Sequence, residues 1–281
     1  MMKTSKSKIA HARRQEIIAL AEAVAETHCP ARFIDPVCIM ANKDITHSAN
    51  YYGDGFDGML EHRSGRFHIY CNLDRVLNLT SPRARFTQGH ELGHFFIDEH
   101  RNALLAGAPA HYSIADQPDA ERIVEQEADL FASHLLMPAA RFSLVFSKQP
   151  HGLEGIRGIV KEFNVSCASA AIRFVEHSTQ PVALAYWRNG KPPWTEVNLA
   201  FRNMGLHHLM NRSDLLPPDC ATSLAIADNP NVYCEPKVSV SLASFWFNGI
   251  YQGSEQDIVI QEEALRLGRF GVLTVLRPRT V

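Results

Sequence analysis

The amino-acid sequence predicts an α+β fold with a mainly helical first part and a strand-rich second part. Helical periodicity dominates residues 83–177, whereas short alternating runs dominate the sequence from Gln180 onward. A further alternating stretch, MLEHRSGRFHIYCNLD, turns at Ser64-Gly65 and predicts a β-hairpin ahead of the helices. We therefore expect one domain over residues 1–178 and a second, strand-rich domain over residues 179–281.

The composition is that of a globular protein without a strong charge of either sign. The chain has 281 residues, 46% of them hydrophobic, and its formal net charge is −2 at pH 7. A chain of this size can bury a sizeable core without staples. The near-neutral charge disfavours non-specific binding to nucleic acid or anionic lipid, because such binding needs a basic excess. No apolar run reaches the roughly 18 residues of a membrane span, so no membrane partner is expected.

Cysteine usage and the N-terminal segment both predict a cytoplasmic protein. The six cysteines are widely scattered and form no C-x-x-C pair, which is typical of reduced thiols. The N-terminal segment has basic residues ahead of an apolar stretch, as a signal peptide does, but charges such as Glu22 and Glu26 interrupt it. Its apolar residues recur at helical spacing and predict an amphipathic helix; they are Ile17, Leu20, Ala21 and Val24.

The remaining elements follow from periodicity and from helix-breaking residues, in chain order. After the hairpin, RARFTQGHELGHFFIDEH predicts one helix, and DAERIVEQEADLFASHLLMP predicts another that ends at Pro138. Two shorter helices should follow. The second part predicts four strands and one helix near QEEALRLG; the strands are PVALAYW, TEVNLAF, KVSVSLASFWF and FGVLTVL.

The segment His90-Glu91-Leu92-Gly93-His94 is an H-E-x-x-H motif inside the first of these helical stretches. Residues at i and i+4 share one helix face, so both imidazoles can reach one metal ion. Glu91 stands beside the first histidine, where its carboxylate can take a proton from a metal-activated water. The motif therefore predicts His90 and His94 as metal ligands and Glu91 as the catalytic base.

Two residues compete for the place of the third ligand. His100 lies at the spacing of the H-E-x-x-H-x-x-G-x-x-H pattern, but Ile97 replaces the glycine that turns the chain. A continuing helix would then point His100 elsewhere. Glu125 is the better candidate, because Glu125 and Asp129 share one helix face in the E-x-x-x-D arrangement of thermolysin-like zincins. In that arrangement Glu125 binds zinc and Asp129 orients a ligand histidine.

Two other acidic residues of the same helix, Glu121 and Glu127, are interpreted as solvated charges. Glu127 lies two positions from Glu125 and would therefore face away from the metal.

Three segments in this order, RARFTQGHELGH, EQEADLFASHLLMP and FNVSCASAAIRF, make the chain resemble the ImmA/IrrE-type metallopeptidases. The resemblance covers about residues 83–175. It implies a minimal zincin-like fold, a helix-turn-helix-like segment at about residues 152–177, and cytoplasmic, site-specific proteolysis. Members typically cleave a helix-turn-helix repressor of the XRE type and so release stress-response or mobile-element genes.

The same resemblance implies His90, His94 and Glu125 as ligands of one zinc ion, for which manganese can substitute, and Glu91 as the catalytic base. Asp129 stands where many members have asparagine. Residues 179–281 match no sensor-like GAF domain of the better-known members, so a sensing or docking role is an expectation from position alone.

The open coordination position of a His-His-Glu site predicts a catalytic metal, and an oxyanion helper is then expected nearby. His111 and Tyr112, in the loop between the two motif helices, are candidates for it.

The helix-turn-helix-like segment leaves a second function open. It could bind DNA or the repressor, but Arg173 is the one arginine or lysine of its second helix, and its alanines favour close packing on the peptidase core. The alternative function is a DNA-binding transcriptional regulator with a structural or vestigial zinc site. An intact Glu91 argues against it, because a structural site needs no base.

Overall fold

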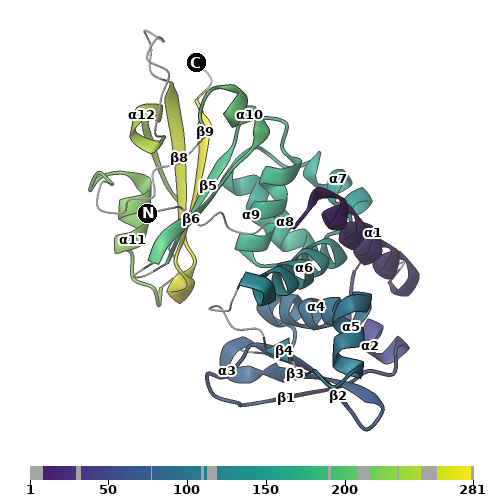
Figure 1. Ribbon diagram of the computed structural model, residues 1–281. Helices are drawn as coiled ribbons and strands as arrows, with labels where there is room; N and C mark the ends of the chain where they lie inside the picture. The colour runs from purple at the N-terminus through teal and green to yellow at the C-terminus, as the bar shows by residue number, and fades with distance from the viewer. Residues whose placement is uncertain are drawn as a thin grey trace. The chain divides into compact units, whose positions relative to one another are not determined.

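The computed structural model describes residues 9–29, 33–76, 78–108, 111–112, 119–188, 191–207, 216–232, 234–247 and 258–279 (Figure 1). The chain forms two compact units, and both helices and sheets are present, which confirms the α+β prediction. The first unit comprises Met1–Leu144 and Phe163–Ser166, and the second comprises Val145–Glu162 and Cys167–Val281. These compact units divide the chain at other residues than the predicted boundary near residue 178. Whether residues 1–178 and 179–281 are separate domains stays a prediction.

The helices of the first unit include the predicted N-terminal and motif helices, together with short helices that the sequence did not predict. They are α1 (His11–His28), α2 (Pro36–Asn42), α3 (Leu73–Val76), α4 (Pro82–Phe96), α5 (Asp98–Leu105), α6 (Asp119–Leu136) and the first part of α7 (Ala139–Phe146). Helix α4 begins where the Ser81 hydroxyl accepts a hydrogen bond from the Ala84 amide and Pro82 takes the first helical position. It ends at Phe96, because Ile97 adopts an extended conformation before α5 begins. The single helix predicted through His100 is therefore wrong.

The sheet of the first unit has the strand order β1-β3-β2-β4. Its strands are β1 (Thr46–Asn50), β2 (Gly58–Arg63), β3 (Arg66–Asn72) and β4 (His111–Tyr112). The predicted hairpin is confirmed: β2 and β3 are antiparallel, and Ser64 and Gly65 both have positive φ, as a two-residue hairpin turn of type I′ requires. Helix α4 packs on β2 and β3, so the motif helix rests on this sheet (Figure 1).

Two glycines on one face of α4 allow α6 to approach closely. A Cβ atom added at Gly93 would lie 3.1 Å from the Ala128 Cα, whereas one added at Gly89 would make an ordinary 3.4 Å contact with the Ala132 Cβ. Helix α1 packs on α6 as well, so α6 is covered from two sides. The two helices that carry the predicted ligands are thus held in direct backbone contact.

The second unit is built on a five-stranded antiparallel sheet with the order β6-β5-β9-β8-β7. The strands are β5 (Ala183–Arg188), β6 (Lys191–Val197), β7 (Lys237–Leu242), β8 (Val259–Arg266) and β9 (Val272–Pro278). The other elements are α8 (Leu153–Phe163), α9 (Cys167–His177), α10 (Leu199–Asn203), α11 (Ala221–Ala227), α12 (Ala243–Trp246) and η2 (Gly268–Phe270). Buried residues of α10, α11 and α12 join one sheet face in a single apolar core.

Most of the segment QEEALRLG lies in strand β8, which ends at Arg266, so the helix predicted there is wrong. Alternate residues of β8, Ile260, Glu262 and Ala264, are fully buried. The buried Glu262 carboxylate accepts hydrogen bonds from the Thr222 amide and the Ser239 hydroxyl, at 2.5 and 2.9 Å. Sheet pairing and these contacts override the helical preference of the local sequence.

The two helices predicted in the helix-turn-helix-like segment are present as α8 and α9. Ala170 and Ala171 are fully buried, as close packing requires, and α9 packs on β5 and β6. Both strands belong to the sheet of the second unit. No helix among the described residues is long and apolar enough to cross a membrane.

Candidate metal site

Helix α4 places the two motif histidines side by side. His90 and His94 are one turn apart, and their Nε2 atoms lie 3.1 Å from each other. Both residues are buried, with relative exposures of 4% and 0%. Neutral imidazoles turn their lone pairs toward a common point only where a cation or a proton can occupy it. The pair therefore forms half of a site for a positive ion.

Glu125 of α6 supplies the third group. Its carboxylate oxygens lie 3.1 Å from the His90 Nε2 and 3.4 Å from the His94 Nε2. Ligands about 2.0–2.2 Å from a tetrahedral zinc lie roughly 3.3–3.5 Å from one another, so these separations suit such an ion. Within the part of the chain that the structure describes, this is the one cluster of three potential metal-ligating side chains. The predicted His-His-Glu set is thus brought together.

Two of the three groups shift each other's pKa. Burial disfavours the charged form of His90, but its hydrogen bonds with Asp129 and Glu125 outweigh burial and raise its pKa well above the usual value. Burial likewise opposes ionisation of Glu125, yet the hydrogen bonds from His90 and His94 hold its pKa far below the usual value. A metal ion at this site therefore competes with protonation of His90, because a histidine ligand must be neutral.

Asp129 contacts His90 on the side away from the cluster. Its Oδ1 atom lies 2.9 Å from the His90 Nδ1, which is the contact that the sequence predicts. A carboxylate accepts only, so the proton of a neutral His90 sits on Nδ1 and leaves Nε2 as a lone-pair donor. The Asp129 side chain is 57% exposed, so water competes for this contact.

Glu91 is fully buried between α4 and the start of β2. A Cβ atom added at Gly58 would lie 2.8 Å from the Glu91 Oε1, so the carboxylate occupies space that a side chain would fill at any other residue type. Burial, followed by the charge of Glu91, raises the pKa of the nearby Cys71 thiol to about 12. Cys71 therefore stays a neutral thiol beside the base and does not compete as a thiolate ligand.

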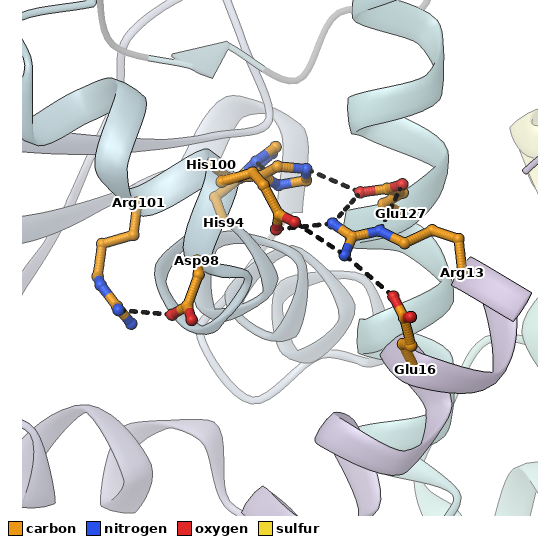
Figure 2. Close-up of polar contacts among 8 residues, drawn as sticks. Arg13, Glu16, His94, Asp98, His100, Arg101 and Glu127 are labelled. Atoms are coloured by element: carbon orange, nitrogen blue, oxygen red, sulfur yellow. Dashed lines mark hydrogen bonds and ion pairs between the residues drawn. The ribbon is translucent and has the colours of Figure 1, made fainter.

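His100 and Glu127 form a contact that sequence reasoning missed (Figure 2). The His100 Nδ1 lies 3.2 Å from the His94 Nδ1, and its Nε2 lies 3.1 Å from a Glu127 carboxylate oxygen. His100 thus sits behind His94, away from the cluster, although the chain does turn at Ile97. Glu127 is 7% exposed, so its interpretation as a solvated charge is wrong. It does face away from Glu125, but α1 and α5 cover that side.

The proposed oxyanion helpers lie partly outside the described residues. The backbone of His111 and Tyr112 forms β4, which pairs with Leu60 and Met59 of β2. Their side chains are outside the described residues, so both roles stay predictions.

The part of the chain that contains this site matches a known protein family. Residues 77–175 match a peptidase family described as the IrrE N-terminal-like domain, which confirms the resemblance predicted from the three sequence segments. The match contains the four central residues of the site: His90, Glu91, His94 and Glu125. It begins well after α1 and ends within α9.

Comparison with curated proteins finds no match. Among solved structures, the fold is similar to that of a Mycobacterium tuberculosis transcriptional regulator, with a TM-score of 0.59 and 10% sequence identity. The similarity covers 95% of this chain and 78% of that chain. At this identity the likeness shows the fold alone.

Proposed function

We propose that this protein is a zinc-dependent, site-specific endopeptidase. The observation that carries the proposal is the convergence of His90, His94 and Glu125 on one point, next to a fully buried Glu91. Two neutral imidazoles and one carboxylate are the protein ligands of catalytic zinc in several peptidases, where a further position stays open. The family match over residues 77–175 supports the same chemistry.

Each residue of the site has a distinct task in this proposal. Bound zinc would supply a Lewis acid that polarises the scissile carbonyl and lowers the pKa of water to ~7. Glu91 accepts a proton from the attacking water and returns it to the leaving amine. Asp129 holds His90 with its Nε2 lone pair toward the metal. The packing of Glu91 against Gly58 limits its motion, so that its carboxylate is preorganised for proton transfer.

The substrate class follows from the family resemblance. We propose a cytoplasmic helix-turn-helix repressor of the XRE type, whose cleavage would release stress-response or mobile-element genes. Binding of an extended substrate segment to a sheet edge is a usual way to hold a peptide for cleavage. In the described part of the first sheet, β1 and β4 are the edge strands, and β4 pairs with the strand whose first residue touches Glu91.

The test is incubation of the full-length protein with XRE-type repressors encoded near its gene, with zinc or manganese added, followed by mass spectrometry of the products. We expect one defined cleavage that Glu91→Gln abolishes and a chelator prevents. Many unspecific cuts, or cleavage that persists in Glu91→Gln, would contradict the proposal.

The alternative of a DNA-binding regulator has less support in the structure. Arg173, the one arginine or lysine of α9, is 7% exposed and its guanidinium lies 3.4 Å from the Glu176 carboxylate. A recognition helix needs exposed cations for phosphate contacts. A mobility-shift assay beside the cleavage assay separates the two functions, because specific DNA binding without cleavage would favour the regulator.

A further inference from the structure

Behind the candidate metal site, a chain of polar contacts runs from the buried His94 to the partly exposed Arg13 of the N-terminal helix. We propose that His100 and Glu127, held by Arg13 of α1, are positioning residues that fix the His94 ring for metal binding. The inference rests on the metal-binding half of the proposed function. It adds residues from α1, α5 and a second face of α6 to the site (Figure 2).

The order of the contacts fixes where the protons sit. Glu127 is an acceptor, so the His100 Nε2, which lies 3.1 Å away, must donate to it. A neutral His100 then has its lone pair on Nδ1. This lone pair faces the His94 Nδ1 at 3.2 Å, so that atom must carry a proton and donate. The remaining lone pair of His94 is on Nε2, the atom that faces His90 and Glu125.

Arg13 holds the far end of this chain of contacts. We call the chain, which comprises His94, His100, Glu127 and Arg13, the relay. Its Nε and Nη2 atoms each lie 3.0 Å from one Glu127 oxygen, which is the paired geometry that best orients a carboxylate. Its Nη1 and Nη2 atoms also donate to the two oxygens of Glu99 on α5, at 3.1 and 2.8 Å. One guanidinium therefore ties α1 to both α5 and α6. A lysine could not reproduce these bonds, because it lacks the planar fork.

Burial distinguishes this relay from the contact that orients the other histidine. The side chains of His94, His100 and Glu127 are 0%, 4% and 9% exposed, whereas Asp129 beside His90 is 57% exposed. Water can replace a lost contact at Asp129, but it has little access to the ring of His94. Loss of the acceptor behind His94 therefore leaves a buried N–H group without its partner, which is costly in a dry interior.

The relay also gives α1 a role in a site that lies far from it in sequence. The family match begins at residue 77, so Arg13 lies outside it. Buried contacts of Ile17, Ala21 and Val24 hold α1 on the helical core, and Arg13 is positioned by the same packing. The first helix is therefore part of the metal site.

The central test compares two substitutions of His100 in the full-length protein. His100→Phe keeps the size of the side chain but removes the acceptor, whereas His100→Asn places an amide oxygen on Cγ where Nδ1 stood. Zinc affinity is measured by competition with a chelator, and cobalt(II) absorbance reports the ligand set. We expect ~10- to 100-fold weaker zinc binding in His100→Phe, the usual loss when a residue that orients a ligand is removed. The loss should be smaller in His100→Asn, which keeps an acceptor for His94 but gives up the contact with Glu127.

The matched control is Asp98→Asn on the same helix. Asp98 is 73% exposed and pairs with Arg101, away from His94, so zinc affinity should not change (Figure 2). Thermal unfolding without metal reports the packing cost of each variant separately. A merely structural role would lower the stability of both His100 variants and leave zinc affinity unchanged. Equal affinities of His100→Phe and the wild type would overturn the relay.

Arg13→Ala tests the contribution of α1. We expect a several-fold loss of zinc affinity, whereas Glu16→Ala, which removes a 66% exposed partner 3.4 Å from the same guanidinium, should change nothing. Wild-type affinity in Arg13→Ala would remove α1 from the site.

A measurement on the unmodified protein decides the point without relying on a variant. Nitrogen-15 NMR of the zinc-loaded chain should show a solvent-protected proton on the His94 Nδ1, coupled to the His100 Nδ1. A proton on the His100 Nδ1 instead would overturn the proposal. Failure of the wild type to bind zinc would contradict the proposed function, whereas zinc binding without this proton would contradict the relay alone.

Discussion

Gly93 of α4 lies so close to Ala128 of α6 that a Cβ atom at the glycine would meet the Ala128 Cα at 3.1 Å and its carbonyl oxygen at 3.2 Å. This approach sets the distance between the helix that carries the two histidines and the helix that carries Glu125. The geometry of the candidate site thus depends on a residue that has no side chain.

Gly93→Ala should therefore push α6 away from α4 and weaken metal binding. The backbone of Ala128 must shift by a few tenths of an ångström, and overpacking of this kind costs about 1–3 kcal/mol of unfolding free energy. Thermal or urea unfolding measures the stability, and a chelator competition measures zinc affinity.

Gly89→Ala is the matched control, since it adds the same methyl group on the same helix but meets ordinary contacts at 3.4 Å and beyond. It should leave zinc affinity unchanged and can raise stability by about 0.5–1 kcal/mol, because alanine favours the helix. Equal effects of the two substitutions would show that close approach at Gly93 is not what sets the site.

Glu91→Gln should remove activity while it preserves the fold and the metal. Glutamine has nearly the same shape, and Glu91 lies outside the ligand cluster, but the amide cannot accept a proton. We expect cleavage to fall by about 10²- to 10⁴-fold, the usual contribution of a general base. Zinc content and peptide cleavage are measured on the same preparation. Loss of zinc in this variant would instead place Glu91 among the ligands.

Substitutions of Glu125 and Asp129, two acidic residues of α6, should weaken zinc binding to different degrees. Glu125→Ala should lose zinc, because it removes one of the three candidate ligands. Asp129→Ala should weaken binding by at most ~10- to 100-fold, and toward the lower end because its carboxylate is 57% exposed. Zinc titrations of both variants check this order. Tighter binding in Glu125→Ala than in Asp129→Ala would reject Glu125 as the third ligand.

Asp57 should make the free energy of unfolding depend on pH under acidic conditions. Burial raises its pKa, but hydrogen bonds from Arg75 and Arg83, at 2.8 and 2.7 Å, outweigh burial and leave the pKa below its usual value. A depressed pKa in the folded state means that the stabilisation is present above the unfolded-state pKa of ~3.9 and is lost as pH falls through the folded value. These bonds join the residue before β2 to α3 through Arg75 and to the first turn of α4 through Arg83.

Asp57→Asn should therefore lower the free energy of unfolding at pH 7 by about 1 kcal/mol, with the difference from wild type shrinking below about pH 4. Urea unfolding at several pH values measures it. Asp54→Asn is the control, because Asp54 meets the same Arg75 at 3.6 Å but is 97% exposed, so stability should hardly change. A constant difference between Asp57→Asn and wild type at all pH values would contradict the electrostatic origin.

The central site was accessible from sequence because its signals are local. His90 and His94 stand four residues apart on one helix, and Glu125 and Asp129 repeat that spacing on another, so helix geometry alone fixes which side chains share a face. The hairpin at Ser64-Gly65 and the cap at Ser81 are local for the same reason. In each case the backbone conformation depends on a few neighbouring residues.

Contacts between elements that are distant in sequence could be found only in the tertiary structure. Glu127 was interpreted as a solvated charge because the sequence of α6 does not reveal that α1 and α5 cover it. In the structure Glu127 lies between Arg13 and His100. The segment near Glu262 looked helical until pairing with β7 and β9 made it a strand. The sequence by itself thus determined which side chains share a face of α4 and which share a face of α6, through spacing on single helices. Only the packing of distant elements decided which charges are buried. Burial matters because it excludes water, so that a charged residue such as Glu127 contacts His100 behind the site.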